Sequence, residues 1–356
     1  MNQTRIGIVG VGGIAKGVHI PGYQAAIGGK VTALCDISDN ALDQGAEICS
    51  LDKSQCYTDY LDLIASEDVD AVDICTPNNL HCTIAEEAIR KGKPFSVEKP
   101  MGLSHAETAR IHDLAQKAGV VGHVCFSWRY RPYIRYMKWL ISQGVCGKLY
   151  HGYIRCIKDS GLWPGRKLEW RFDKKQAGTG VLGDLASHMY DLTRFITGEE
   201  FTGISAQTGI WIKSRQKLDS DDFAEVTTDD WCNALVDMRS GLNVTYQISR
   251  CATTIGDSVG IELYGSNGML RYMNHSGQQT LEICSGEVDM TGQGSHFVVP
   301  PARFNASQSQ AFINLVQDTD DGLSATLADG VICQKVLDAT EKAAASKRWI
   351  SISEEG

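Results

Sequence analysis

The sequence predicts an α/β protein of two domains: an N-terminal domain on a doubly wound parallel sheet, and a C-terminal α/β domain on an open, mostly antiparallel sheet. Two observations carry this prediction. Through residues 1–125, short apolar strands alternate with helices, which is typical of strand–helix–strand units with parallel pairing. Beyond residue 198, runs of alternating apolar and polar residues are separated by short turns. We therefore expect domains at 1–125 and 126–356, and two domains also suit 356 residues.

Each N-terminal element has its own local signal. Ser104, followed by Glu107, has the form of a helix-initiating capping box, and Gly119 ends the same helix. Helical spacing predicts further helices between the first two strands and over residues 41–49, 59–66 and 81–91. Apolar runs predict strands over residues 5–9, 30–36, 71–75, 94–98 and 120–126.

The C-terminal part has a different pattern of polar and apolar residues. Ser240-Gly241 and Asn267-Gly268 supply turns between strands of alternating polarity. The strands expected there are residues 231–237, 242–249, 259–264 and 269–273, and the helices are 135–143, 307–318 and 328–346. Residues 158–183 are rich in Gly, Lys, Arg and Trp, and a loop of that length is often the wall or lid of an active site.

Composition and charge exclude several classes of function. The chain is 43% hydrophobic and 22% charged, which is ordinary for a soluble globular protein. Its net charge of −9 disfavours nucleic acid or an anionic membrane as the main partner. No apolar run approaches the roughly 18 residues that a membrane span requires. Because the first residues run directly into a strand, we expect no signal peptide.

The twelve cysteines are scattered and form no Cys-x-x-Cys pair. The usual spacing of a zinc site or a redox dithiol is therefore missing. We expect these residues to be buried thiols that behave as small hydrophobic side chains in a reducing cytoplasm. The sequence thus predicts a cytoplasmic protein without a metal site.

A glycine-rich loop follows the first strand. In Gly10-x-Gly12-x-x-Ala15, the first glycine permits a tight turn, the second lets a pyrophosphate approach, and Ala15 lets the helix pack closely on the strand. Asp36 ends the next strand at the spacing expected of a carboxylate that binds the adenosine ribose. Because this carboxylate would repel a 2′-phosphate, we expect NAD in preference to NADP. The alternative is that Asp36 only forms a turn before Ser38.

Thr76-Pro77-Asn78 ends the strand that should lie across the point where the strand order reverses. Polar side chains at that position would face the cofactor. The alternative is a plain Pro-Asn turn, because such dipeptides mark turns in any fold.

Three further residues suggest proton transfer. Lys99 follows a short strand, at the sheet edge where such folds bind ligands, and its ammonium could stabilise an alkoxide. Asp184, His188 and Asp191 are spaced to share one helix face, so a carboxylate could orient a histidine that accepts a proton. Two alternatives remain open. Asp184 could cap a helix while His188 fills a core, or the three could ligate a metal, although a second histidine or a thiolate is missing.

Together these motifs resemble those of the Gfo/Idh/MocA oxidoreductases, which include glucose–fructose oxidoreductase and inositol dehydrogenase, over essentially the whole chain. The matching pieces are Gly10-Val11-Gly12-Gly13-Ile14-Ala15, Asp36, Thr76-Pro77-Asn78 with His81, Glu98-Lys99-Pro100, and Gly183-Asp184 with His188 and Asp191.

The resemblance implies a Rossmann domain followed by an α/β domain that forms homodimers or homotetramers through its open sheet. It implies Lys99 and His188 as the catalytic pair, with Asp184 orienting the substrate or the histidine. It places Glu98 near the nicotinamide ribose, and it adds His81, Gly13 and Ile14 to the cofactor-binding residues.

The expected substrate is a sugar or a cyclic polyol with a secondary alcohol, because relatives act on such compounds. Aromatic rings suit the apolar face of a sugar, and arginines suit its hydroxyls or a carboxylate. The residues expected to contact it are Arg129, Trp163, Trp170 and Arg171, together with Asp184 and His188. For any single tryptophan, core packing is the alternative.

Three functions are compatible with these residues. The first is an NAD-dependent dehydrogenase of a sugar, sugar derivative or polyol. The second is a glycosidase or lyase of the same fold, which oxidises the sugar transiently and then eliminates a leaving group. The third is a non-catalytic NAD-binding sensor, against which the joint presence of Lys99, Asp184 and His188 argues.

Overall fold

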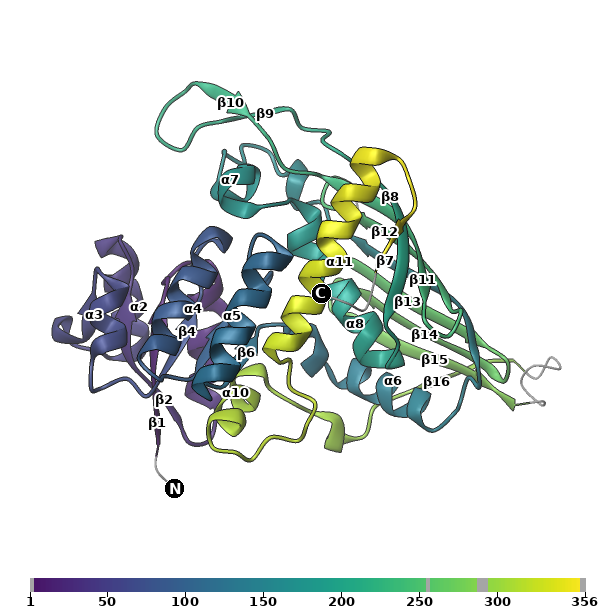
Figure 1. Cartoon of the computed structure of the whole chain (residues 1–356), viewed down its shortest axis with the longest axis horizontal. Helices are drawn as coiled ribbons and strands as arrows, with labels where there is room; N and C mark the ends of the chain where they lie inside the picture. The colour runs from purple at the N-terminus through teal and green to yellow at the C-terminus, as the bar shows by residue number, and fades with distance from the viewer. Residues whose placement is uncertain (1–2, 254–256, 287–293, 353–356) are drawn as a thin grey trace. The chain divides into compact units, whose positions relative to one another are not determined.

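A six-stranded parallel sheet and a larger mixed sheet organise the chain in the computed structural model, which describes residues 3–253, 257–286 and 294–352 (Figure 1). The chain divides into two units. Unit 1 comprises Met1–Ser127 and Ala306–Gln334, and unit 2 comprises Trp128–Asn305 and Lys335–Gly356. The sequence analysis assigned all of residues 126–356 to one domain, whereas the structure returns Ala306–Gln334 to unit 1.

The sheet of unit 1 has the order β3-β2-β1-β4-β5-β6, and its neighbouring strands pair in parallel. This is the strand order of dinucleotide-binding folds, with the order reversing between β1 and β4. Its strands are β1 (Thr4–Val9), β2 (Gly29–Cys35), β3 (Cys56–Tyr57), β4 (Ala71–Ile74), β5 (Phe95–Val97) and β6 (Gly122–Val124). The predicted doubly wound parallel sheet is therefore confirmed.

The helices of unit 1 begin and end at residues with clear capping chemistry. Ser38 and Ser104 cap α2 and α5 by accepting backbone N–H groups, and Gly119 ends α5 at φ +64°. The helices are α1 (Ile20–Ala25), α2 (Asp39–Cys49), α3 (Tyr60–Ala65), α4 (His81–Arg90), α5 (His105–Ala118) and α10 (Gln308–Val316). A π-helical turn, Ala15–His19, leads into α1 and was not predicted.

The return of residues 306–334 to unit 1 has a packing cause. Phe312 and Ile313 of α10 are fully buried in the same cluster as Ile6 and Ile8 of β1. The backbone N–H of Val124 also donates to the carbonyl of Ala325 at 3.1 Å. Apolar burial and one added backbone pairing therefore attach this late segment to the first sheet.

Unit 2 is built on a sheet whose described strands have the order β16-β15-β14-β13-β7-β12-β11-β8-β17. Its neighbouring strands pair antiparallel except β7 and β12, which pair in parallel, so the predicted mostly antiparallel sheet is confirmed. The strands are β7 (Leu149–Ile157), β8 (Phe201–Gly209), β11 (Trp231–Met238), β12 (Asn243–Ser249), β13 (Ser258–Gly265), β14 (Gly268–His275), β15 (Gln278–Ser285), β16 (His296–Val298) and β17 (Ile350–Ser351). A separate hairpin joins β9 (Ser214–Gln216) to β10 (Phe223–Glu225).

Helices cover one face of this sheet. The hydroxyls of Thr193 on α8 and Tyr246 on β12 lie 2.7 Å apart, and Tyr133 on α6 packs on Tyr272 of β14 with ring centroids 6.1 Å apart. The helices are α6 (Pro132–Ser142), α7 (Lys174–Ala177), α8 (Ser187–Thr197) and α11 (Leu327–Ser346), and α11 runs on from unit 1. A π-helical turn, Leu182–Ala186, leads into α8.

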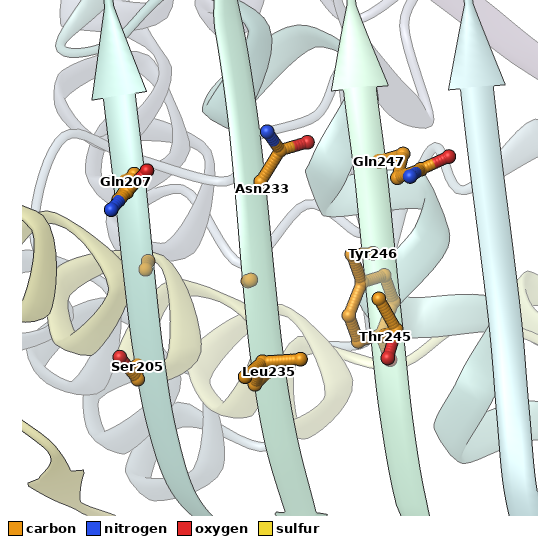
Figure 2. Close-up of a pocket in the computed structure, with 9 residues that line it drawn as sticks. Ser205, Gln207, Asn233, Leu235, Thr245, Tyr246 and Gln247 are labelled. Atoms are coloured by element: carbon orange, nitrogen blue, oxygen red, sulfur yellow. The ribbon is translucent and has the colours of Figure 1, made fainter.

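The other face of the sheet carries exposed side chains. Along β11, Cys232, Ala234 and Val236 are buried, while Asn233 and Leu235 between them point outward. A hollow of about 240 Å³ on this face is lined by residues of β8, β11 and β12. Figure 2 shows the side chains that line it. We call the outward-facing residues of β7, β8, β11, β12 and β13 the open face.

Two further expectations concern the cysteines and membrane-spanning helices. All twelve cysteines are free thiols, eight of them buried and four half-buried, so the expected burial holds for most of them. Within the described residues, no helix has the length and apolar character needed to cross a bilayer.

Candidate active site

The glycine loop lies at the carboxyl end of β1, and its glycines are needed for different reasons. Gly10 has φ +92°, and a Cβ there would lie 2.7 Å from the carbonyl carbon of Cys75, so the chain itself requires glycine. Gly12 and Gly13 are exposed, and a Cβ on either would meet no described atom within 4 Å beyond its chain neighbours. The loop therefore keeps open space at these two positions, as a pyrophosphate requires.

Ile14 and Ala15 follow at the start of the helix. Ala15 is fully buried in the unit 1 core, whereas Ile14 is partly exposed. The carbonyl of Gly12 accepts the N–H of Lys16, which begins the helical hydrogen bonding directly after the loop. A helix that starts at this point favours negative charge at its N-terminus.

Asp36 joins the glycine loop to the end of β2. Its carboxylate accepts the N–H of Val11 at 2.7 Å and the N–H of Ser38 at 2.9 Å. The contact with Ser38 forms the turn that we considered as the alternative. The contact with Val11 additionally links Asp36 to the glycine loop. Each oxygen retains a lone pair for a hydroxyl group, since a carboxylate offers about four acceptor sites.

Ile37 was missed by the sequence analysis. Its side chain is 95% exposed although it directly follows Asp36 at the end of the strand. An isoleucine that is exposed to water at this position offers an apolar surface against which a flat base could pack. The available signal was the position itself, an apolar residue after a strand-terminal acid.

His81 supports the loop that follows β4. Its buried ring contacts the carbonyl oxygens of Pro100 at 2.8 Å and Thr76 at 2.9 Å, and burial lowers the pKa of His81. His81 therefore holds the Thr76-Pro77-Asn78 segment against the segment that follows β5. Among the described residues, no group hydrogen-bonds the buried Thr76 Oγ1.

Glu98 and Lys99 follow β5, and the Lys99–Pro100 peptide bond is cis. One Glu98 oxygen accepts the Lys99 N–H at 3.1 Å, and the other lies 3.0 Å from Nε2 of His19. Burial alone would raise the pKa of Glu98, but the hydrogen bond from His19 and the charges of His19 and Lys99 lower it. The carboxylate therefore stays ionised beside the lysine.

In unit 2, Asp184 lies in the π-helical turn, and His188 and Asp191 lie on α8. The expected arrangement on one regular helix is therefore wrong, because the π turn changes the angle between Asp184 and the later residues. Asp184 is half-buried, and His188 is only 6% exposed. The His188 ring stacks on Trp128 with centroids 5.2 Å apart and an angle of 16° between the planes.

Arg129 and Asp191 form a buried ion pair. The Arg129 Nε donates to the Asp191 carboxylate at 2.8 Å, and both side chains are at most 5% exposed. In the structure, Asp191 thus binds a guanidinium, and Arg129, which we expected at the substrate, is an ion-pair partner inside unit 2. Because Asp191 binds Arg129, it does not serve as the third ligand of the metal site that we considered as an alternative.

The three remaining candidates lie in the 158–183 segment. Trp163 is 56% exposed and its Nε1 donates to Asp159, while the Arg171 guanidinium lies 4.3 Å from the centroid of the Trp170 ring. Short 3₁₀ helices, Ser160–Leu162 and Trp170–Phe172, interrupt the segment. The buried Arg215 donates to carbonyls of Gly161 and Arg166 and so anchors it.

The predicted residues thus gather in two groups. Unit 1 brings together, along the carboxyl edge of its sheet, the glycine loop, Asp36, Thr76, Glu98 and Lys99. Unit 2 brings His188 together with Trp128 beside the turn that carries Asp184. We call the first group the cofactor edge.

Comparison with known proteins gives this arrangement a family. Residues 4–126 match the family model described as "Oxidoreductase family, NAD-binding Rossmann fold", and residues 134–271 match the GFO/IDH/MocA C-terminal domain. The chain belongs to the GFO/IDH/MocA oxidoreductase family.

Individual relatives match most of this oxidoreductase. Levoglucosan dehydrogenase of Pseudarthrobacter phenanthrenivorans is 25% identical over 326 residues, with 83% of each chain covered. Inositol 2-dehydrogenase of Rhizobium meliloti is 25% identical, with 98% of this chain and 99% of the relative covered. A solved levoglucosan dehydrogenase in complex with NADH and levoglucosan superimposes with a TM-score of 0.89 at 22% identity, covering 99% of this chain and all of that one, and so has the same fold.

The residues of this family member fit the NAD that its N-terminal domain binds. Gly12 and Gly13 leave open space where a pyrophosphate would lie, and within the described ranges the buried Thr76 Oγ1 has no hydrogen-bond partner. Asp36 follows the glycine loop at the sequence spacing that is expected of a carboxylate that accepts hydrogen bonds from a ribose.

Proposed function

We propose that the protein is a dehydrogenase that uses NAD in preference to NADP and acts on a secondary alcohol of a sugar, a sugar derivative or a cyclic polyol. The observation that carries the proposal is the cofactor edge, where an ionised Glu98 and the adjoining Lys99 stand beside a glycine loop with open space. The names of the relatives, a levoglucosan and an inositol dehydrogenase, support this class of substrate.

The preference for NAD rests on Asp36. Its carboxylate is already fixed by the N–H groups of Val11 and Ser38, so it cannot swing away from a ligand without breaking two hydrogen bonds. A 2′-phosphate would place a second negative charge beside this carboxylate, which costs free energy at short range. A 2′-hydroxyl would instead donate a hydrogen bond to it.

Lys99 and His188 share the proton chemistry in this proposal. When bound, NAD supplies the acceptor for the hydride that leaves the alcohol carbon. The neutral imidazole of His188 accepts the hydroxyl proton, and the ammonium of Lys99 stabilises the oxygen as its negative charge develops. Asp184, which is half-buried in the turn before α8, orients the substrate or the imidazole. The stack on Trp128 holds the plane of the His188 ring.

Absorbance at 340 nm tests the activity directly. The protein is mixed with NAD and, in separate reactions, with inositols, aldoses, anhydrosugars, sugar acids and glycosides. Formation of NADH with one class supports the dehydrogenase and names its substrate. Cleavage of a glycoside without a change in absorbance would instead favour the glycosidase or lyase, and retention of NAD without any turnover would favour the sensor.

Substitution of the proton-transfer residues tests the mechanism. We expect Lys99→Ala and His188→Ala each to lower kcat by about a hundredfold or more, because a proton acceptor or a stabilising charge is lost. The affinity for NAD should change little. Lys91→Ala and His275→Ala, which alter exposed residues of the same types, are the controls. Turnover near the wild-type rate in both active-site variants would contradict the mechanism.

We also propose that the open face joins copies of this chain into a homodimer or homotetramer. Leu235 and Tyr153 on this face are 56% and 50% exposed, and between them lie the polar side chains of Thr245 and Gln247. An apolar residue at the centre of a polar, flat surface is typical of a protein–protein interface.

With a net charge of −9, neither nucleic acid nor an anionic membrane is proposed as a partner. A reducing cytoplasm remains our proposal for the location of the twelve thiols.

A further inference from the structure

A histidine that the sequence analysis missed lies between two carboxylates beneath the cofactor edge. His19 is the last residue of the π-helical turn after the glycine loop, and it is 1% exposed. Its Nδ1 lies 2.7 Å from an oxygen of Asp73 on β4, and its Nε2 lies 3.0 Å from an oxygen of Glu98 after β5. Asp73 is itself fully buried.

This geometry determines the protonation of the ring. With Asp73 and Glu98 both ionised, each carboxylate only accepts, so each ring nitrogen carries a proton and the ring is an imidazolium. Burial alone would lower the pKa of His19, but the charge of Asp73 and its hydrogen bond raise it well above the ordinary value. Two carboxylates around one cation leave the cluster with a negative charge that is held inside unit 1.

The contacts continue from this ring to the lysine. Glu98 receives the His19 Nε2 on one oxygen and the backbone N–H of Lys99 on the other, at 3.1 Å. His19 belongs to the helix that starts at the glycine loop, whereas Lys99 follows β5. The chain of contacts from Asp73 through His19 and Glu98 therefore joins the loop helix to the lysine backbone.

We propose that His19 is a positioning residue: as a buried imidazolium shared by Asp73 and Glu98, it fixes the Glu98 carboxylate and, through it, the backbone from which Lys99 presents its ammonium. The inference rests on the proposed function for the role of Lys99 in proton transfer. The positions of Glu98 and of the Lys99 N–H, however, are measurable without turnover.

A metal ion is the competing explanation for this cluster. Among the described residues, His19, Asp73 and Cys125 offer ligand atoms within 4.8 Å of one another. Both ring nitrogens of His19 already face carboxylates, however, and burial raises the pKa of the Cys125 thiol well above its usual value. Because cysteine binds zinc as a thiolate and a structural zinc site usually has four ligands, a buried imidazolium explains the cluster better.

The first test measures the ring and the amide directly. In protein labelled with ¹⁵N in its histidines and lysines, we expect both His19 ring nitrogens to show imidazolium shifts at pH 7. We expect His19→Gln, which keeps at most one hydrogen bond and no charge, to speed exchange of the Lys99 amide hydrogen by at least tenfold. The Lys91 amide, which donates to the Glu87 carbonyl in α4, is the internal control.

Several outcomes would overturn the proposal. A neutral His19 ring in the wild type would remove the charged bridge, and a ¹⁵N shift that changes when zinc is added would favour the metal. An unchanged Lys99 exchange rate in a folded His19→Gln protein would show that the bridge does not hold this backbone. If His19→Gln fails to fold, Asp73→Asn replaces it, and we expect it to shift the His19 ring toward its neutral form.

The second test separates positioning from a structural role. The titratable groups around Glu98 are His19 in direct contact, and Asp73, Cys75, His81, Cys125 and the Lys99 ammonium nearby. His19 lowers the pKa of Glu98, so its removal raises that pKa and moves the acid limb of kcat to higher pH. We expect His19→Gln to lower kcat about tenfold or more with NADH affinity within threefold, while His112→Gln changes neither. An unshifted pH profile with unchanged kcat would contradict the positioning role, whereas a wild type without turnover would contradict only the proposed function.

Discussion

Single residues at the cofactor edge have several contacts each, and Asp36 is the clearest example. It accepts the Val11 N–H, which fixes the glycine loop, and it keeps acceptor sites that a ribose can use. A substitution at this position therefore acts on the loop and on the ligand together. A pair of variants separates the two effects, because an asparagine retains one carbonyl oxygen for Val11 but no charge.

We expect Asp36→Ala to weaken NAD binding about tenfold or more and NADP binding less, because the repulsion of a 2′-phosphate disappears together with the ribose contact. Asp36→Asn should keep the loop contact and show the same change in preference with a smaller loss for NAD. Titration of the protein's fluorescence with each nucleotide measures the six affinities of the wild type and the two variants. Equal losses for NAD and NADP in Asp36→Ala would remove the argument for cofactor preference.

At the scale of elements, the sequence predicted the regular parts well and the irregular turns poorly. The strands over residues 5–9 and 71–75 were found almost as expected, because buried parallel strands are continuous apolar runs. The π turns Ala15–His19 and Leu182–Ala186 were missed, because one extra residue in a turn leaves no periodic pattern in the sequence. β7 was also missed, although its residues alternate, because its outward side chains include both aromatic and charged residues, and β8 and β15 were not predicted either.

The same limit applies to the candidate site. The motifs identified Gly10, Asp36 and Lys99 because each lies beside a strand end that the sequence reveals. His19 could not be found in this way, since its partners Asp73 and Glu98 are far from it along the chain and meet it only in the folded sheet. The pairing of Asp191 with Arg129 was missed for the same reason.

The α8 helix supplies a stability prediction. Asp191 and Arg129 are buried and bound to each other, so removing one partner leaves an uncompensated charge inside unit 2. We expect Asp191→Ala to lower the free energy of unfolding by about 3–5 kcal/mol. Asp184→Ala, at a half-buried position in the preceding turn, should cost far less and affect activity instead. Urea denaturation of both variants measures the difference, and equal costs would contradict these separate roles.

At the scale of the whole molecule, the open face is the surface through which we propose that copies of this chain associate. A sheet with helices on one face and an apolar residue on the other is incompletely covered as a monomer. Ser205, Asn233 and Leu235 lie on neighbouring strands of this face, with Leu235 the large apolar side chain among them (Figure 2). Association of two such faces would cover the sheet without any change in its strands.

If the wild type forms the proposed oligomer, we expect Leu235→Arg to dissociate it, because like charges would meet in the interface. Ile27→Arg, at a 77% exposed apolar position in unit 1, should leave the mass unchanged. Sedimentation velocity measures the mass of each protein. A wild-type monomer, or a Leu235→Arg protein with the wild-type mass, would contradict the proposed interface.

The return of residues 306–334 to unit 1 affects the order in which the protein can be completed. The ribosome releases the six strands of the first sheet early, yet the core around β1 still lacks Phe312 and Ile313 at that time. The Val124 N–H of β6 likewise lacks its acceptor, the Ala325 carbonyl, until that later segment has been synthesised. Most of the polypeptide must therefore be synthesised while the nucleotide-binding half is unfinished, and a gene fragment that stops after residue 127 would encode a sheet with part of its apolar core exposed. The part of the enzyme that is encoded first is thus among the last to be finished.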